Sequence, residues 1–160
     1  MTSRRAFLTS SMALGSVAVA SQLLPVGAFA QTFEVTRTEA EWKKLLSKAD
    51  YKILRKKGTE RPNSSKLNAE KRAGTFHCKG CDLALYSSET KYESGTGWPS
   101  FWAPIENAVL TRPDNSFFMK RTEVICRRCG SHLGHVFKDG PRPTGLRYCM
   151  NGAAMTFAAA

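Results

Sequence analysis

The five cysteines of this 160-residue chain fall into two groups by their spacing. Four of them form two C-x-x-C pairs, which residues 82–125 separate. A glycine lies inside the first pair (Gly80) and directly after the second (Gly130), as the tight turn between two neighbouring metal ligands requires. Four thiolates at tetrahedral corners are the ligand set that structural Zn²⁺ prefers. The sequence therefore predicts a structural zinc site made of Cys78, Cys81, Cys126 and Cys129.

Other uses of the two pairs stay open at this point. An oxidising compartment would allow two disulfides, and a C-x-x-C pair can also be redox-active, although neither pair here opens a helix in a βαβ pattern. A basic zinc ribbon that binds nucleic acid would share the pairs and the net charge of +11. However, lysine and arginine are scattered along the chain, which favours a solvated basic exterior, so we expect no nucleic-acid partner.

The fifth cysteine, Cys149, stands in the string LRYCMN without a partner in the sequence. On a strand, side chains alternate between faces, so Arg147, Cys149 and Asn151 would project together. A guanidinium beside a thiol lowers the thiol pKa and raises the fraction of reactive thiolate. The alternative is an inert cysteine that packs as a small apolar side chain.

Two further strings carry residue types that suit thiol chemistry. In GSHLGHVF, His132 and His135 precede the turn that leads to Cys149, and either could act as a general acid or hydrogen-bond partner. A metal site is the competing use of this H-x-x-H pair. In SGTGWPSFW, Trp98 and Phe101 would give an aromatic wall for an apolar sulfur group. Their alternative is ordinary core packing, which we expect for one of the two.

The elements that must position these residues change in kind along the chain. Thr38 with Glu41, and Ser47 with Asp50, predict the starts of two short helices. From residue 74 onward, short β-branched and aromatic runs alternate with turn residues such as RPDN (112–115) and KDGPRP (138–143). We therefore predict a mainly β domain with a short helical N-terminal annex.

The N-terminus predicts export rather than structure. The string SRRAFL, a short apolar run and the A-x-A at residues 28–30 form a charged segment, a hydrophobic segment and a cleavage site. We expect residues 1–30 to be a twin-arginine export signal, residues 31–160 the mature domain, and the periplasm its location. The alternative, a membrane anchor, needs about 20 apolar residues. For the exported protein, we expect contact with the membrane to be transient and limited to export.

Residues from about 42 to 157 resemble the type B methionine sulfoxide reductases. The matching strings are KGTERP, the two C-x-x-C pairs, TKYESGTGWPSFW, RCGSHLGHVFKDGPRPTGLRYCMN and AAMTF. The resemblance implies a small domain built around two antiparallel β-sheets and reduction of the R epimer of methionine sulfoxide in proteins. It also assigns roles: catalytic Cys149, His135, His132 and Asn151; substrate-binding Trp98, Arg147 and Phe101; zinc ligands Cys78, Cys81, Cys126 and Cys129.

The implied reaction runs through the cysteine oxidation ladder. The Cys149 thiolate attacks the sulfoxide sulfur, His135 protonates the departing oxygen, and Cys149 is left as sulfenic acid. Many relatives resolve this sulfenic acid with a cysteine at the position that Thr96 occupies here. We therefore expect a monomeric one-cysteine variant that acts on oxidised proteins and is regenerated by a thioredoxin-like thiol reductant.

Overall fold

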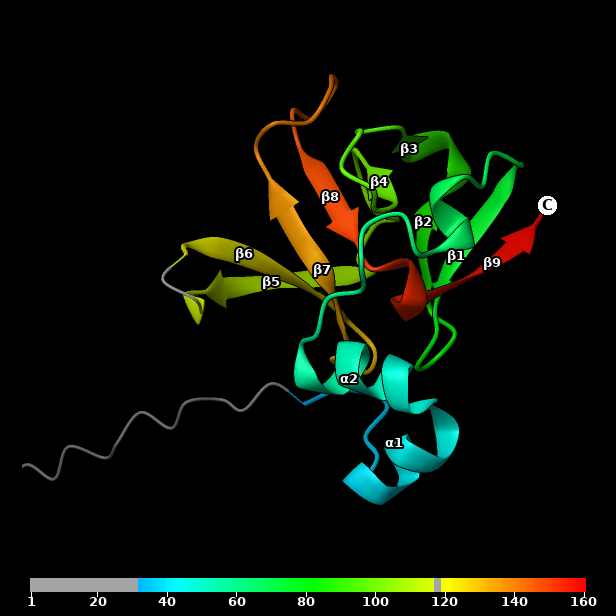
Figure 1. Cartoon of the computed structure of the whole chain (residues 1–160), viewed down its shortest axis with the longest axis vertical. Coiled ribbons are helices and arrows are strands. Elements are labelled where there is room, and N and C mark those ends of the chain that lie inside the picture. The colour runs from blue at the N-terminus through cyan, green and yellow to red at the C-terminus, as the bar shows by residue number, and fades with distance from the viewer. Residues whose placement is uncertain (1–31, 117–118) are drawn as a thin grey trace, which may run out of the picture. The chain divides into compact units, whose positions relative to one another are not determined.

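The computed structural model describes residues 32–116 and 119–160, which form two antiparallel β-sheets (Figure 1). This confirms the predicted mainly β fold with two sheets. The three-stranded sheet has the order β2 (Ala84–Ser87), β1 (Gly74–Cys78), β9 (Met155–Ala159). The six-stranded sheet has the order β3 (Lys91–Tyr92), β4 (Ser100–Phe101), β8 (Arg147–Met150), β7 (His132–Phe137), β6 (Arg121–Cys126), β5 (Val109–Asp114).

The helical annex forms as predicted. Helix α1 spans Glu39–Leu45 and begins with a reciprocal capping box between Thr38 and Glu41. Helix α2 spans Lys48–Lys56, and the Ser47 hydroxyl accepts from the Asp50 backbone N–H at its start. The described residues also include the single-turn helices η1 (Lys66–Asn68), η2 (Ser88–Thr90) and η4 (Gly152–Ala154).

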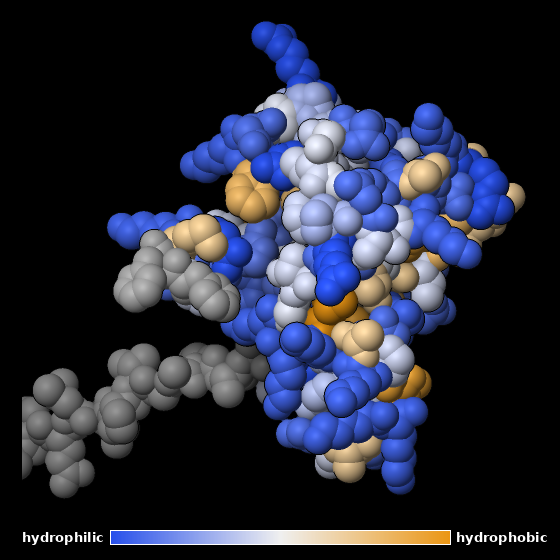
Figure 2. Space-filling view, viewed as in Figure 1, coloured by the Kyte–Doolittle hydropathy of each residue, from blue (hydrophilic) through white to orange (hydrophobic). Residues whose placement is uncertain are grey.

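The expected export signal lies outside the described residues. Within the part of the chain that the structure describes, no helix is long and apolar enough to cross a membrane. Figure 2 shows a mainly hydrophilic face on which hydrophobic residues form small, separate spots.

Aromatic rings fill the space between the two sheets. The Phe101 ring stacks on Tyr86 at 4.3 Å between centroids and meets Phe76 edge-on at 5.0 Å. All three side chains are fully buried. Phe101 pairs with Tyr148 across β4 and β8, so both side chains lie on the core face of the six-stranded sheet. The prediction that Phe101 contacts substrate is therefore wrong, because alternation along β4 turns it into the core.

One predicted turn is also wrong. Arg112, Pro113 and Asp114 of the RPDN string belong to strand β5, and the chain turns only after them. Proline is tolerated here because β5 is an edge strand, where a missing backbone N–H on the outer side leaves no ladder bond unmade. The KDGPRP turn lies between β7 and β8, as predicted.

Candidate active site

A row of polar residues crosses the whole six-stranded sheet. Each member is the direct cross-strand partner of the next, and paired residues project to the same face. The row brings Cys149 on β8 beside His135 on β7. From β3 to β5 its members are Tyr92, Ser100, Cys149, His135, Glu123 and Arg112.

A β-bulge adds His132 to the same face. Two residues three apart on a regular strand point to opposite faces. Here Val124 pairs with Gly134 while the next residue of β6, Ile125, pairs with His132, so Leu133 is an extra residue in β7. This insertion restores His132 to the face of His135, and the two rings lie 5.5 Å apart at an interplanar angle of 66°.

The Cys149 thiol opens into a cavity of about 160 Å³. Its wall contains two aromatic rings, Trp98 and Phe137. The Trp98 indole N–H donates to the Glu60 carbonyl at 3.2 Å, which fixes the ring. The remaining lining residues are Thr59, Arg121, His135, Met150 and Asn151. An apolar sulfur group would thus meet a thiol, an imidazole and two aromatic faces.

Arg147 does not line this cavity. Its guanidinium forms two hydrogen bonds with the Asp139 carboxylate, at 2.9 and 2.8 Å, and lies 4.4 Å from the centre of the Phe137 ring. Arg147 therefore holds an aromatic wall of the cavity instead of contacting its contents. Phe137 takes the place that sequence analysis gave to Phe101.

Burial raises the pKa of the Cys149 thiol above its usual value, although a hydrogen bond with Thr96 and the charge of Arg147 act in the opposite direction. The sequence-based expectation of a lowered pKa is therefore wrong in its net direction. Arg147 contributes with the expected sign, but its charge is shared with Asp139 and cannot offset the desolvation of the thiolate.

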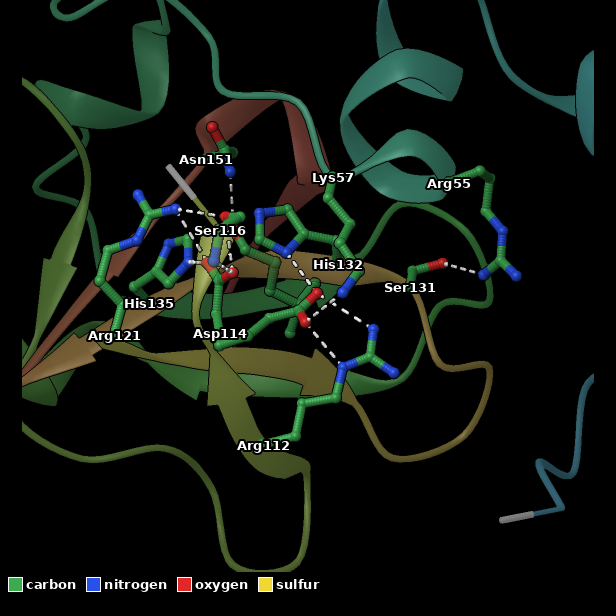
Figure 3. Close-up of polar contacts among 12 residues, drawn as sticks. Arg55, Lys57, Arg112, Asp114, Ser116, Arg121, Ser131, His132, His135 and Asn151 are labelled. Atoms are coloured by element: carbon green, nitrogen blue, oxygen red, sulfur yellow. Dashed lines mark hydrogen bonds and ion pairs between the residues drawn. The ribbon is translucent and has the colours of Figure 1, made fainter. Parts of the chain in front are cut away.

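His135 lies at the junction of two cavities. Its Nε2 atom is 2.7 Å from Asp114 Oδ2, and the same carboxylate accepts from Arg121 at 2.8 Å. Burial lowers the pKa of His135, while the Asp114 hydrogen bond partly counteracts that effect. The second cavity, of about 320 Å³, is lined by His135, His132, Asp114, Ser116, Arg121 and Lys57 (Figure 3), together with Lys56 and Thr59.

His132 lies beside His135 but does not line the cavity of Cys149. Its Nδ1 atom is 2.8 Å from the buried Glu123 carboxylate, which also accepts from Arg112 at 2.7 Å and Lys57 at 2.9 Å (Figure 3). Burial would raise the pKa of Glu123, but these three hydrogen bonds hold it well below its usual range. Because the ionised carboxylate can only accept, Nδ1 carries the proton. His132 lines the second cavity and not that of Cys149.

Asn151 and Glu60 tie the loop before η1 to the end of β8. The Asn151 side chain donates to the Leu133 carbonyl at 3.1 Å and accepts from the Glu60 backbone N–H at 3.0 Å. The Glu60 carboxylate accepts from the backbone N–H groups of Gly152 and Ala153, at 2.5 and 2.9 Å. Sequence reasoning did not single out Glu60 or Thr59, although both stand in the KGTERP string.

The four remaining cysteines form a cluster that could hold a metal ion. The Sγ atoms of Cys78 and Cys129 are 3.7 Å apart, those of Cys81 and Cys126 are 3.5 Å apart, and all four lie within 4.8 Å of one another. A tetrahedral ion with bonds of about 2.3 Å places its sulfur ligands about 3.8 Å apart, so the cluster fits such an ion.

The two turns that carry these cysteines follow the same pattern. The residue after each pair is in the left-handed region, Asp82 with φ 60° and Gly130 with φ 67°. Gly80 does not have a positive φ, so its predicted role in the first turn is wrong. Its missing side chain instead leaves room for Ser131 and Trp42, which lie 3.0 and 3.3 Å from where a Cβ would be.

Comparison with known proteins decides the family. The SelR domain matches residues 46–159. The chain belongs to this family. Among its relatives, the peptide methionine sulfoxide reductase MsrB of Pseudomonas putida (strain W619) is 54% identical over 125 residues, covering 78% of this chain and 94% of the relative. The MsrB of Leptospira interrogans serovar Lai is 51% identical, covering 78% and 96%.

The MsrB of Methanosarcina barkeri is 54% identical over 77% of this chain and 87% of its own length. This SelR-domain chain is therefore an MsrB family member and an oxidoreductase. Among solved structures, the Mis18 'Yippee-like' domain aligns with a TM-score of 0.45 and 18% identity, covering 56% of this chain and 98% of that one.

The structure gathers part of the predicted site of this MsrB family member around one cavity. Cys149, His135, Trp98 and Asn151 line it. His132 and Arg147 stand behind the lining residues, and Phe101 lies in the core. The arrangement can present a thiol and a proton donor to the same small group, with aromatic rings around them.

Proposed function

We propose that this chain reduces the R epimer of methionine sulfoxide in proteins to methionine. The observation that carries the proposal is the direct pairing of Cys149 with His135 at one cavity walled by Trp98 and Phe137. The MsrB names of its relatives support the same reaction. The aromatic wall would hold the methyl group, and the proton donor would bind the oxygen on another side of the same sulfur. Because the two epimers place these groups differently, this arrangement would distinguish them.

In the proposed step, the Cys149 thiolate attacks the sulfoxide sulfur and His135 gives its proton to the oxygen. The protonated oxygen then passes to the Cys149 sulfur. The sulfur–sulfur bond formed in the attack and the original sulfur–oxygen bond both break, so methionine leaves and Cys149 is left as sulfenic acid. The substrate is reduced by two electrons and the cysteine sulfur is oxidised by two. Asp114 keeps the His135 ring in place through its 2.7 Å contact with Nε2.

Regeneration would need two external thiols. The first displaces water from the sulfenic acid to form a mixed disulfide, and the second releases Cys149 as a thiol with an external disulfide. Thr96 and not a cysteine stands beside Cys149, and the other four cysteines belong to the metal cluster. We propose a one-cysteine cycle with a thioredoxin-like reductant. We also propose that the protein is a monomer, and that a twin-arginine signal at residues 1–30 exports it to the periplasm.

The four-cysteine cluster would hold Zn²⁺ with a purely structural role. Cys78, Cys81, Cys126 and Cys129 would occupy all four positions of a tetrahedral ion, which leaves none for substrate or water. The ion would supply charge neutralisation for four thiolates and a fixed link between two turns. The reacting groups are the chain's own side chains at Cys149.

The test supplies the purified protein with dithiothreitol and a peptide carrying either the R or the S epimer of methionine sulfoxide. We expect loss of the R epimer alone, and a rate at least about 10³-fold lower in Cys149→Ser. Reduction of the S epimer would contradict the proposed stereochemistry. Bound metal with neither epimer reduced would instead favour a structural metal module with no catalytic cysteine.

A further inference from the structure

A chain of three hydroxyl groups leads from the Cys149 sulfur into the protein. Thr96 Oγ1 is 3.9 Å from Cys149 Sγ and 2.8 Å from Ser94 Oγ, which is 2.7 Å from Ser100 Oγ. Ser100 is fully buried in the polar row, and its hydroxyl donates to the Trp98 carbonyl at 3.1 Å. We propose that Thr96 is a catalytic hydrogen-bond donor to the Cys149 thiolate, and that this hydroxyl chain reverses its direction when Cys149 ionises.

The direction of the chain in the thiol state follows from counting protons. Each hydroxyl has one proton to donate. Because Ser100 donates to the Trp98 carbonyl, it must accept from Ser94, and Ser94 must then accept from Thr96. Thr96 has no proton left for the sulfur, so the Cys149 S–H donates to Thr96. Every bond then runs from the sulfur toward the buried carbonyl.

The thiolate state requires the opposite direction. A thiolate can only accept, so Thr96 must donate to it, Ser94 to Thr96, and Ser100 to Ser94. The Trp98 carbonyl loses its donor in exchange. No covalent bond breaks in the chain, because a carbonyl oxygen cannot take up the proton at its end. Three hydroxyl groups rotate, and the Cys149 proton leaves through the cavity.

This reversal matters because Cys149 is otherwise poorly suited to ionise. The titratable groups around it are His135 on β7, Arg121 on β6, Tyr92 on β3 and Arg147 on its own strand, whose charge Asp139 shares. Arg147 also acts on the sulfur through a hydrogen bond, but its guanidinium is paired with Asp139 by two hydrogen bonds. A donor that is already held in place by Ser94 stabilises the thiolate without ordering a new group from solvent.

The experiment measures the rate of Cys149 alkylation by iodoacetamide as a function of pH, using peptide mass spectrometry on the full chain. We compare Thr96→Val, which keeps the shape and loses the hydroxyl, with Thr96→Ser, which keeps the hydroxyl. We expect Thr96→Val to move the midpoint up by about 0.5 to 1 pH unit, so alkylation below it slows about three- to tenfold. Thr96→Ser should stay close to the wild-type midpoint.

Two further variants test whether the effect depends on the whole hydroxyl chain or on Thr96 alone. Ser94→Ala leaves Thr96 in place and removes its donor, so we expect a smaller shift in the same direction. Thr111→Val, at an exposed position on β5, is the matched control and should not shift the midpoint. A wild-type midpoint in Thr96→Val or in Ser94→Ala would overturn the proposal. The inference rests on the proposed function for its catalytic meaning, but alkylation needs no substrate, so the two can fail separately.

Discussion

At the scale of single residues, the two reacting groups have pKa values displaced in unfavourable directions. Burial raises the pKa of Cys149 and lowers that of His135. The form that the reaction requires, a thiolate beside a protonated imidazole, is therefore a small fraction of the enzyme at neutral pH. That form has the same number of protons as the dominant form, thiol beside neutral imidazole. The ratio between the two forms is therefore independent of pH.

This relation predicts the pH dependence of kcat/KM. The rate should rise as pH increases through the lowered pKa of His135, stay level across neutrality, and fall above the raised pKa of Cys149. Asp114 raises the pKa of His135, so Asp114→Asn should move the acid limb to lower pH. It should also lower kcat/KM in the pH-independent region about tenfold, because fewer molecules hold the proton on His135.

The comparison for this substitution is Glu106→Gln, which removes one carboxylate from an exposed loop away from the cavity residues. Its pH profile should match that of the wild type. If Asp114→Asn moved the acid limb to higher pH, or left both limb and level unchanged, Asp114 would not be the group that favours the protonated imidazole.

At the scale of elements, the approach of β7 to β8 fixes the distance between imidazole and thiol. Gly134 lies between His135 and the bulge, and a Cβ there would be 2.2 Å from the Cys149 carbonyl oxygen and 2.9 Å from the Met150 Cα. Both are backbone atoms, so a side chain must push the strands apart. Only glycine allows this close approach of the strand that carries His135 to the strand that carries Cys149.

Gly134→Ala should therefore reduce both stability and activity. We expect a loss of about 1–3 kcal/mol in the free energy of unfolding, measured by urea denaturation, and a larger proportional fall in kcat/KM. Gly80→Ala is the comparison, since its nearest neighbour is the Ser131 hydroxyl at 3.0 Å, a side chain that can shift. Equal effects of the two substitutions would show that the β7–β8 spacing does not control the reaction.

The sequence could predict elements better than the faces their residues occupy. The Thr38 and Ser47 caps act through neighbouring residues, so both helix starts were predictable. The exposure of Phe101 depends on the register of β4 against β8, which no local pattern contains. The RPDN string predicts a turn at Pro113, because proline is tolerated in β5 only through the position of that strand at the sheet edge, which the local sequence does not show.

For the candidate site too, the residues could be predicted better than the faces on which their side chains lie. Cys149, the two histidines and Trp98 could be chosen from residue type and spacing. The bulge at Leu133, which puts His132 and His135 on one face, depends on pairing with β6 and could not. Likewise, the net rise in the pKa of Cys149 reflects burial by residues distant in the chain, whereas the sequence showed only the nearby Arg147.

At the scale of the whole described domain, the cysteine cluster joins the two sheets. Cys78 and Cys81 belong to the end of β1 and its turn, in the three-stranded sheet, while Cys126 and Cys129 belong to the end of β6 and its turn. Helix α2 is fastened at the same place, because Arg55 donates to the Cys129 carbonyl at 3.2 Å and to the Ser131 hydroxyl at 3.3 Å. A metal ion bound there would hold two sheets and a helix together.

Loss of that ion should therefore destabilise the whole domain and not only its own turns. Cys81 and Cys149 are both partly buried, yet only Cys81 belongs to the cluster, which makes Cys81→Ser and Cys149→Ser a matched pair. We expect Cys81→Ser to lose bound metal and at least about 3 kcal/mol of unfolding free energy, measured by metal analysis and urea denaturation. Cys149→Ser should keep both. If Cys81→Ser lost its metal with no change in stability, the sheets would be held by the aromatic core alone, and the cluster would need a role other than a structural link.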